Sequence, residues 1–150
     1  MKVLITGEEG QLARALTAVR PSDLDLIAMN RHALDVGDAE AVRQAVDEHG
    51  PDLIINTAAY NQVDQAESDR ENAFAVNARG PAHLAAQGVR LIHISTDYVF
   101  DGTADQPYPP HAPTHPLGVY GKSKLAGEEA VLAAAGQGHV VVRTAWLYDY

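Results

Sequence analysis

The chain has 150 residues, the size of one globular domain, with 46% hydrophobic and 21% charged residues. Its 20 acidic and 11 basic residues give a formal net charge of −9, which repels nucleic acid and anionic lipid. It has no cysteine and no run of about 18 apolar residues, which excludes thiolate chemistry, disulfide scaffolds and a membrane-spanning helix. We therefore expect a cytoplasmic protein that binds neither nucleic acid nor a membrane.

Short apolar runs alternate with helical patterns along the whole chain. The predicted strands are residues 2–6, 24–29, 53–56, 91–95 and 140–143. The predicted helices are residues 11–19, 39–49, 67 to about 86, and 117 to about 135. Such alternation predicts an α/β fold, a doubly wound parallel sheet with helices on both faces.

Local signals refine three of these segments. Asp38 is a candidate N-cap for the second helix, and Gly50-Pro51 should end it. Gly80-Pro81 interrupts the third helical pattern, so we expect a kink or a restart there. The segment 101–116 contains five prolines and is predicted to be a functional surface loop.

The first strand runs into a G-x-x-G-x-x-A turn that begins at Gly7 and includes Gly10. Glycines in such a turn let the backbone approach a pyrophosphate, whose oxygens the N–H groups of the following helix can bind. The same spacing also serves ordinary tight turns. Glu8 and Glu9 lie in this turn, and their side chains must point outward if a pyrophosphate binds.

Tyr120 and Lys124 are four residues apart and share one face of a predicted helix. A nearby ammonium favours the phenolate, so Lys124 is expected to lower the pKa of Tyr120 and make it a tuned acid. An unrelated surface pair is the alternative. Ser95 or Thr96, at the carboxyl end of the fourth strand, could hydrogen-bond a reacting carbonyl, or could simply cap a turn.

Several longer motifs make the chain resemble the extended short-chain dehydrogenases/reductases, and within them the dTDP-4-dehydrorhamnose reductase family. The most specific are Ser-Thr-Asp-Tyr-Val-Phe-Asp-Gly at 95–102 and Tyr-Gly-Lys-Ser-Lys-Leu-Ala-Gly-Glu at 120–128. Matching segments also occur at 56–60, 63–67, 76–78 and 143–146. The resemblance implies a Rossmann-like fold over residues 1–150, the NAD(P)-binding domain, without the family's carboxyl-terminal substrate domain.

The resemblance also implies an activity, the NAD(P)H-dependent reduction of the 4-keto group of dTDP-4-dehydro-L-rhamnose to dTDP-L-rhamnose. Tyr120 would be the proton donor, Lys124 its electrostatic partner and ribose ligand, and Thr96 the hydroxyl that holds the keto oxygen. The 150-residue chain alone is expected to be inactive, because only one wall of the cleft is encoded. A homodimer is compatible with the family.

The remaining site residues follow from the same resemblance and from the glycine turn. Cofactor contacts are expected from Gly7, Gly10, Gln11, Leu12, Asn30, Arg31, Asp35, Val36, Ala58, Ala59, Tyr60, Asn77, Tyr120 and Lys124. Substrate contacts are expected from Val63, Thr96, Asp97, Tyr98 and Trp146. Arg31 favours NADPH over NADH, which stays a second candidate, because arginine accommodates a 2′-phosphate. No metal is expected, since Ala15 stands where some members of the family carry a glutamate.

Two other functions stay open at this point. One is a non-catalytic, nucleotide-binding regulatory subunit of the same family. The other is a related sugar-nucleotide epimerase or dehydratase that shares the Tyr/Lys pair. Dehydratases usually add acidic residues beside the active-site threonine, whereas here Asp97 is followed by Tyr98, which favours simple reduction.

Overall fold

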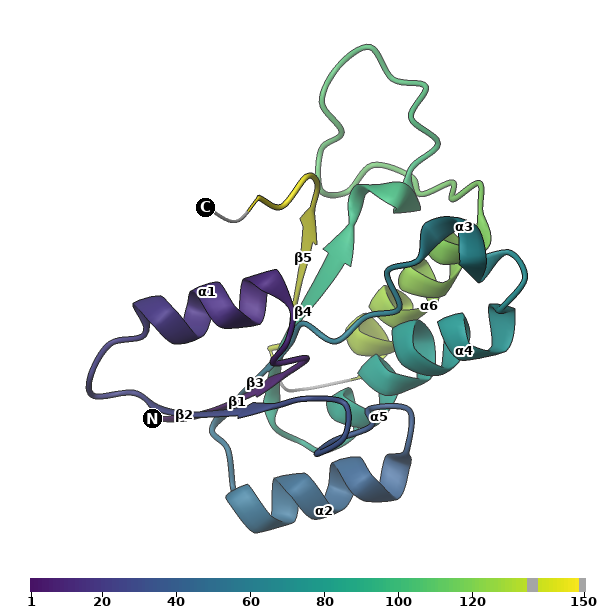
Figure 1. The fold of residues 1–150 in the computed structure, drawn as a ribbon. Coiled ribbons are helices and arrows are strands. Elements are labelled where there is room, and N and C mark those ends of the chain that lie inside the picture. Colours follow the sequence, from purple (N-terminus) through teal and green to yellow (C-terminus); the bar gives the residue numbers. More distant parts are fainter. Residues whose placement is uncertain (135–137, 149–150) are drawn as a thin grey trace.

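In a computed structural model, which describes residues 1–134 and 138–148, five parallel strands form one sheet in the order β2-β1-β3-β4-β5 (Figure 1). The strands are β1 (Lys2–Thr6), β2 (Asp25–Met29), β3 (Leu53–Asn56), β4 (Arg90–Thr96) and β5 (Val140–Thr144). Each prediction for a strand agrees to within one residue at either end. The predicted parallel α/β fold is therefore confirmed.

Helices connect the strands and lie on both faces of the sheet. They are α1 (Gln11–Val19), α2 (Ala39–His49), α3 (Val63–Ala66), α4 (Arg70–Phe74), the π-helical η1 (Ala75–Arg79), α5 (Gly80–Ala85), the 3₁₀ turn η2 (Asp97–Val99) and α6 (Val119–Ala133). The bounds of α1 and α2 agree with the prediction. The start of α6 lies two residues later than predicted, and residue 135, its predicted end, is outside the described residues. Segment 101–116 has no regular structure, as expected.

The two predicted signals at the ends of α2 are confirmed. The Asp38 side chain accepts hydrogen bonds from the backbone N–H groups of Glu40 and Ala41, which have no partner within the helix. At the other end, Gly50 adopts a left-handed conformation with φ of 53° and donates its N–H to the carbonyl of Val46. Both caps are local, which explains why the sequence alone located this helix.

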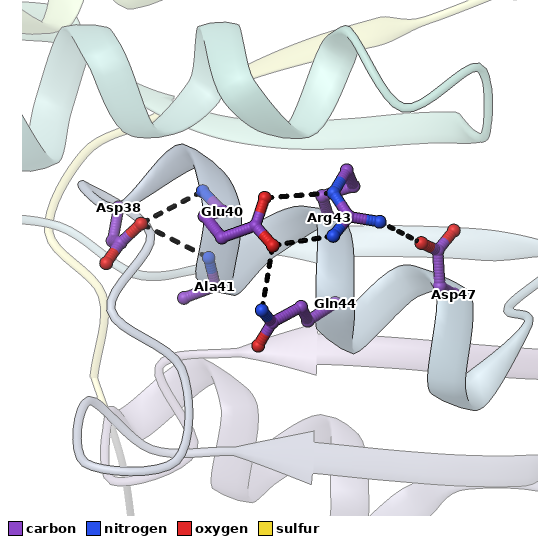
Figure 2. Close-up of polar contacts among 6 residues, drawn as sticks. All are labelled: Asp38, Glu40, Ala41, Arg43, Gln44 and Asp47. Carbon is purple, nitrogen blue, oxygen red and sulfur yellow. Dashed lines mark hydrogen bonds and ion pairs between the residues drawn. The ribbon is translucent and has the colours of Figure 1, made fainter.

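The solvent face of α2 carries a group of charged side chains (Figure 2). Arg43 pairs with Glu40 on the preceding turn and with Asp47 on the following one, the latter at 2.6 Å. The arginine holds the pKa of Glu40 at about 2. All three side chains are more than half exposed, so solvent screens these pairs and their contribution to stability is small.

The third predicted helical segment, 67 to about 86, is helical from Arg70 to Ala85, so its start lies three residues later than predicted. A separate turn, α3, precedes it, and the longer helical run begins only at Arg70. The expected interruption at Gly80-Pro81 is a wide π turn, in which the Gly80 N–H bonds the carbonyl of Ala75, five residues earlier. In an α-helix the ring of Pro81 would clash with the carbonyl of Asn77. Here that carbonyl instead lies against Gly127 of α6, and the helix continues without a break.

The sheet is covered unequally on its two faces. On one face, α1 packs on β1 through Ala13, Val3 and Ile5. On the other, α2, α5 and α6 enclose the larger core, which is built from Leu4, Leu34, Val36, Val42, Ala45, Val46, Ile54, Leu84, Ala85, Leu91 and Val131. In Figure 1, α1 lies apart from α4, α5 and α6, which confirms the predicted doubly wound arrangement.

The strand order places a crevice at one edge of the sheet. The chain leaves β1 toward β2 on one side and then returns to β3 on the other. The connections after β1 and β3 therefore diverge, and ligands of such sheets bind outside the carboxyl ends of the strands at this point. Among the described residues, no helix is both long and apolar enough to cross a membrane.

Candidate active site

A cavity of about 430 Å³ opens at the carboxyl ends of β1 and β3. Its walls come from the turns after β1, β2 and β3 and from η1. The lining includes Gly7, Glu9, Gly10, Asn30, Arg31, Leu34, Asp35, Val36, Thr57, Ala58, Ala59, Tyr60, Asn61, Gln62 and Val76. Nine of the residues predicted to contact a cofactor line this one cavity.

The glycine turn after β1 has the geometry that close approach requires. Gly7 has φ of 77°, and a Cβ at this position would lie 2.8 Å from the backbone nitrogen of Ala58. Gly10 is the N-cap of α1 and offers no side-chain cap, so the N–H groups of the first helical turn have no side-chain partner. This open helix start suits an anionic group such as a diphosphate. Glu9 lines the cavity, whereas Glu8 is exposed outside it.

The far end of this cavity is formed by the turn after β2. The Asn30 side chain accepts hydrogen bonds from the N–H groups of His32 and Ala33, which shapes the turn. Arg31 follows, exposed, and also lines a neighbouring cavity of about 610 Å³ together with Asp35. An arginine in this position can reach an anionic substituent at the adenosine end of a dinucleotide.

A second cavity, of about 510 Å³, continues from the first and shares Gly10, Thr57 and Ala59 with it. It brings together side chains from α1, β4, η2, α6 and the end of β5. All of the predicted catalytic and substrate-binding residues line it: Val63, Thr96, Asp97, Tyr98, Tyr120, Lys124 and Trp146. Gln11 and Leu12, predicted to contact the cofactor, also lie here.

Both hydroxyl residues at the end of β4 line the second cavity, and they differ in the partners of their hydroxyl groups. Ser95 is buried under α6 and donates its hydroxyl hydrogen to Glu128. Thr96 lines the cavity, donates to Asp97 at 3.1 Å and accepts a hydrogen bond from the Tyr98 N–H. The structure therefore favours Thr96 as the hydroxyl that meets a carbonyl.

Tyr120 differs from the prediction in its acidity. Its ring packs edge-on against Tyr98, with centroids 5.5 Å apart. Burial raises the pKa of Tyr120, the Thr96 hydroxyl opposes this, and the charge of Asp97 adds to it. The pKa of Tyr120 is thus raised and not lowered as predicted, because the desolvation of the phenol dominates. Tyr120 is therefore protonated at neutral pH, the form that a proton donor needs.

Lys124 is 2% exposed and its ammonium donates a 2.7 Å hydrogen bond to the carbonyl of Ile94. Burial lowers the pKa of Lys124 to about 8, while the negative charge of Glu128 opposes that shift. The group remains mostly cationic at neutral pH. It supplies a fixed positive charge inside the second cavity.

Asn77 is the one predicted cofactor residue that lines neither cavity. Its side chain is fully buried, accepts a hydrogen bond from the Tyr60 N–H and donates to the Tyr60 carbonyl and to the Ser123 hydroxyl. Asn77 thus ties the turn after β3 to α6. Its direct contact with a cofactor stays a prediction.

A polar row beneath the site was missed at the sequence level. Thr6, Asn56 and His93 are register partners on neighbouring strands and are fully buried. The Thr6 hydroxyl donates to the side-chain oxygen Oδ1 of Asn56, and the side-chain nitrogen Nδ2 of Asn56 lies 3.0 Å from His93 Nδ1. Burial lowers the pKa of His93 to about 3, so its ring is neutral. The available signal was a polar residue in three apolar strands, at the ends of β1 and β3 and in the middle of β4.

A metal centre is not evident in the described part of the chain. No group of three or more His, Asp or Glu side chains that could hold an ion occurs in residues 1–134 and 138–148. Ala15 is exposed on α1. The expectation that no metal binds stays a prediction.

A glycine turn at the switch point of a parallel sheet is followed by a cavity with Thr96, Tyr120 and Lys124, an arrangement that can hold a dinucleotide beside a carbonyl group. Residues 1–150 match the family described as the RmlD substrate binding domain, and the chain belongs to that family. The resemblance inferred from the motifs is thereby confirmed.

Similar proteins share this part of the chain. A curated relative from Mycobacterium tuberculosis, named dTDP-4-dehydrorhamnose reductase, is 49% identical over 156 residues, covering 98% of this chain and 50% of the relative. One from Streptomyces niveus, named dTDP-4-keto-6-deoxy-D-glucose reductase, is 45% identical over 150 residues, covering 97% and 52%. The structure of dTDP-4-dehydrorhamnose reductase from Bacillus anthracis in complex with NADP has a TM-score of 0.93 at 39% identity, covering 99% and 55%. The chain spans about half the length of these relatives.

Proposed function

We propose that the chain binds NADPH across its two joined cavities and provides the catalytic side chains for reduction of the 4-keto group of dTDP-4-dehydro-L-rhamnose to dTDP-L-rhamnose. The observation that carries the proposal is that Thr96, Tyr120 and Lys124 line one cavity, which continues into the glycine turn at Gly7 and Gly10. The same observation favours an enzyme over a non-catalytic subunit.

NADPH, when bound, supplies the hydride that adds to the carbonyl carbon. The Thr96 hydroxyl donates to the keto oxygen and orients it. As negative charge develops on that oxygen, Tyr120 transfers its phenolic proton to it, and the product is a hydroxyl group. The ammonium of Lys124, fixed by Ile94, stabilises the phenolate that Tyr120 leaves behind.

The substrate class is supported by the names of the relatives. Both curated relatives are named as reductases of keto sugars linked to dTDP. Reduction is further favoured over dehydration by the residues after Thr96, where only Asp97 is acidic and Tyr98 follows. Arg31, at the far end of the first cavity, supports NADPH as the cofactor, with NADH as the weaker alternative.

The second cavity is open on the side of Trp146, which is 81% exposed. We propose that residues 1–150 form the NAD(P)-binding domain, and that turnover needs the substrate domain of the family to complete the other wall. Positioning can contribute about 7–11 kcal/mol to catalysis and needs both walls. The chain alone therefore binds NADPH without reducing the sugar nucleotide. A homodimer and a cytoplasmic location belong to the same proposal.

A two-part experiment tests this function. NADPH is titrated into the chain while its fluorescence is followed, and saturation below millimolar concentration is expected. The chain is then joined to the carboxyl-terminal half of the Mycobacterium tuberculosis relative, and NADPH oxidation with dTDP-4-dehydro-L-rhamnose is measured. A Tyr120→Phe change should lower the rate by about 10² to 10⁴ with unchanged NADPH binding. No saturation, or a Tyr120→Phe rate near that of the parent, would refute the proposal.

A further inference from the structure

Arg143, on β5, makes contacts to three separate parts of the molecule. Its Nε and Nη2 atoms donate to the carboxylate of Glu128 on α6, the shortest distance being 2.6 Å. Its Nη1 atom donates to the carbonyl of Pro110 at 3.1 Å. The guanidinium plane also lies over the ring of Phe100, 4.9 Å from its centroid. The guanidinium thus joins a strand, a helix and the proline-rich segment 101–116.

On the helix side, these contacts lead to the catalytic residues. Glu128 is 1% exposed, lies one turn beyond Lys124 on α6, and also accepts a hydrogen bond from Ser95. The ammonium of Lys124 donates a hydrogen bond to the carbonyl of Ile94, the residue before Ser95 on β4. Two consecutive residues of β4 therefore hold α6 in place, and Arg143 secures the second of these attachments from β5.

On the segment side, the contacts lead to a small folded unit. The Phe100 ring stacks on Tyr108, with centroids 4.2 Å apart and planes 4° from parallel. The Tyr108 hydroxyl donates to Asp101, and the His115 N–H donates to the carbonyl of Val99. The segment leaves the second cavity after Tyr98 and returns to it before Tyr120, so its position bears on both rings.

We propose that Arg143 is a positioning residue that ties segment 101–116 to the helix of Tyr120 and Lys124 through the buried carboxylate of Glu128. The meaning of this link for catalysis rests on the proposed function, whereas the link itself does not. Proline lacks the N–H that would pair the segment with neighbouring strands, and the Arg143 side chain supplies an attachment at Pro110 in addition to the backbone bond from His115 to Val99. Lysine can replace the arginine only in part, because only a planar guanidinium can bond a carboxylate through two nitrogens, bond a carbonyl and cover a ring at once.

Hydrogen–deuterium exchange of the whole chain tests the proposal. The parent chain is compared with Arg143→Gln and Arg143→Lys, and Arg43→Gln, at an exposed arginine on α2, is the matched control. In Arg143→Gln, the amides of Ala112 and His115, both hydrogen-bonded within or next to the segment, should exchange at least tenfold faster, with α2 amides unchanged. Arg143→Lys should recover part of this protection, and Arg43→Gln should leave it intact. Unchanged exchange in Arg143→Gln, or equal acceleration in α2, would overturn the proposal.

A second variant covers the case in which Arg143→Gln does not fold. Phe100→Leu removes the ring between Arg143 and Tyr108 and leaves the pair with Glu128 in place. The segment should again exchange faster, by at least threefold, while the Kd for NADPH stays within twofold. Exchange equal to that of the parent chain would overturn the proposal. A parent chain that fails to bind NADPH would refute the proposed function alone, because the exchange comparison needs no cofactor.

Discussion

The ammonium of Lys124 donates a 2.7 Å hydrogen bond to the carbonyl of Ile94, two residues before Thr96 on the same strand. This bond attaches α6 to β4 beside the attachment that the next strand residue, Ser95, makes to Glu128. The cation and the Thr96 hydroxyl therefore keep a fixed relation to each other through the strand. Because the ammonium is buried to form this bond, its titration becomes coupled to the stability of the fold.

The first prediction concerns this coupling. Lys124 has a pKa of about 8 in the folded chain, below its ordinary value of 10.5. Above pH 8 the folded chain loses a proton that the unfolded chain still holds, so stability rises with pH up to about 10.5. Relative to Lys124→Met, which cannot titrate, the parent chain should gain about 3 kcal/mol across this window. Urea unfolding at several pH values measures the difference.

Lys122, exposed on the same helix, supplies the control. Lys122→Met should follow the pH dependence of the parent, because it leaves Lys124 and its bond to Ile94 in place. A constant stability difference between the parent and Lys124→Met from pH 7 to 10 would contradict the assignment of a buried, depressed lysine.

The second prediction separates two properties of Gly7, its positive φ and its close approach to the backbone of Ala58. Gly7→Ala places a Cβ within 2.8 Å of Ala58 and forces alanine into a positive φ, so the turn must shift. NADPH binding should weaken at least about tenfold, which corresponds to about 1.4 kcal/mol. Gly50→Ala, at φ of 53° with open space around it, also forces alanine into a positive φ, far from the cavity. It should lose stability and keep its NADPH affinity, as fluorescence titration would reveal.

The third prediction concerns the crossing of α6 and η1. A Cβ on Gly127 would overlap the carbonyl of Asn77 and come within 3.2 Å of the Pro81 ring. Gly127→Ala should therefore cost about 3 kcal/mol, the upper end for overpacking, because the opposing atom is backbone. Gly88→Ala, with φ of 72° and nothing within 4 Å, should cost only about 1 kcal/mol. Thermal unfolding compares the two, and equal losses would argue against the tight crossing.

The fourth prediction concerns cofactor choice. Removing the charge in Arg31→Ala should weaken NADPH binding about 10- to 100-fold, the range for hydrogen bonds to charged groups, with NADH binding unchanged. Arg20→Ala removes an arginine that bonds the Thr17 carbonyl away from the cavities, and it should change neither affinity. Parallel titrations with the two cofactors decide the matter. An equal loss of affinity for NADPH and NADH would contradict the prediction, because Arg31 would then attract any anion and would not recognise the 2′-phosphate.

The parts of the fold that the sequence predicted are those with local causes. The apolar run of β1 leads directly into the glycine turn, and α2 has its caps at Asp38 and Gly50 within one turn of its ends. The site residues were found for a similar reason. They sit at strand ends and at helical spacing, and parallel strands bring such positions to one edge of a sheet.

The errors arose where distant residues decide the local structure. The helical pattern after residue 66 did not reveal that the helix starts only at Arg70, because the Glu67 carboxylate instead accepts a 2.7 Å hydrogen bond from the Val119 N–H and caps the start of α6. That contact spans more than fifty residues of sequence. The pKa of Tyr120 was likewise misjudged, because spacing reveals the neighbouring Lys124 but not the burial of the phenol.

The π turn at Ala75–Arg79 sets the phase of the helix that follows it. It accommodates one residue more than an α-helical turn, so deleting a single residue there would rotate everything downstream by about 100° about the helix axis. Leu84 would then turn out of the core, and Pro81 would leave Gly127. Most surface loops tolerate a change in length of one residue. Here the same change would turn the buried face of the following helix away from the core.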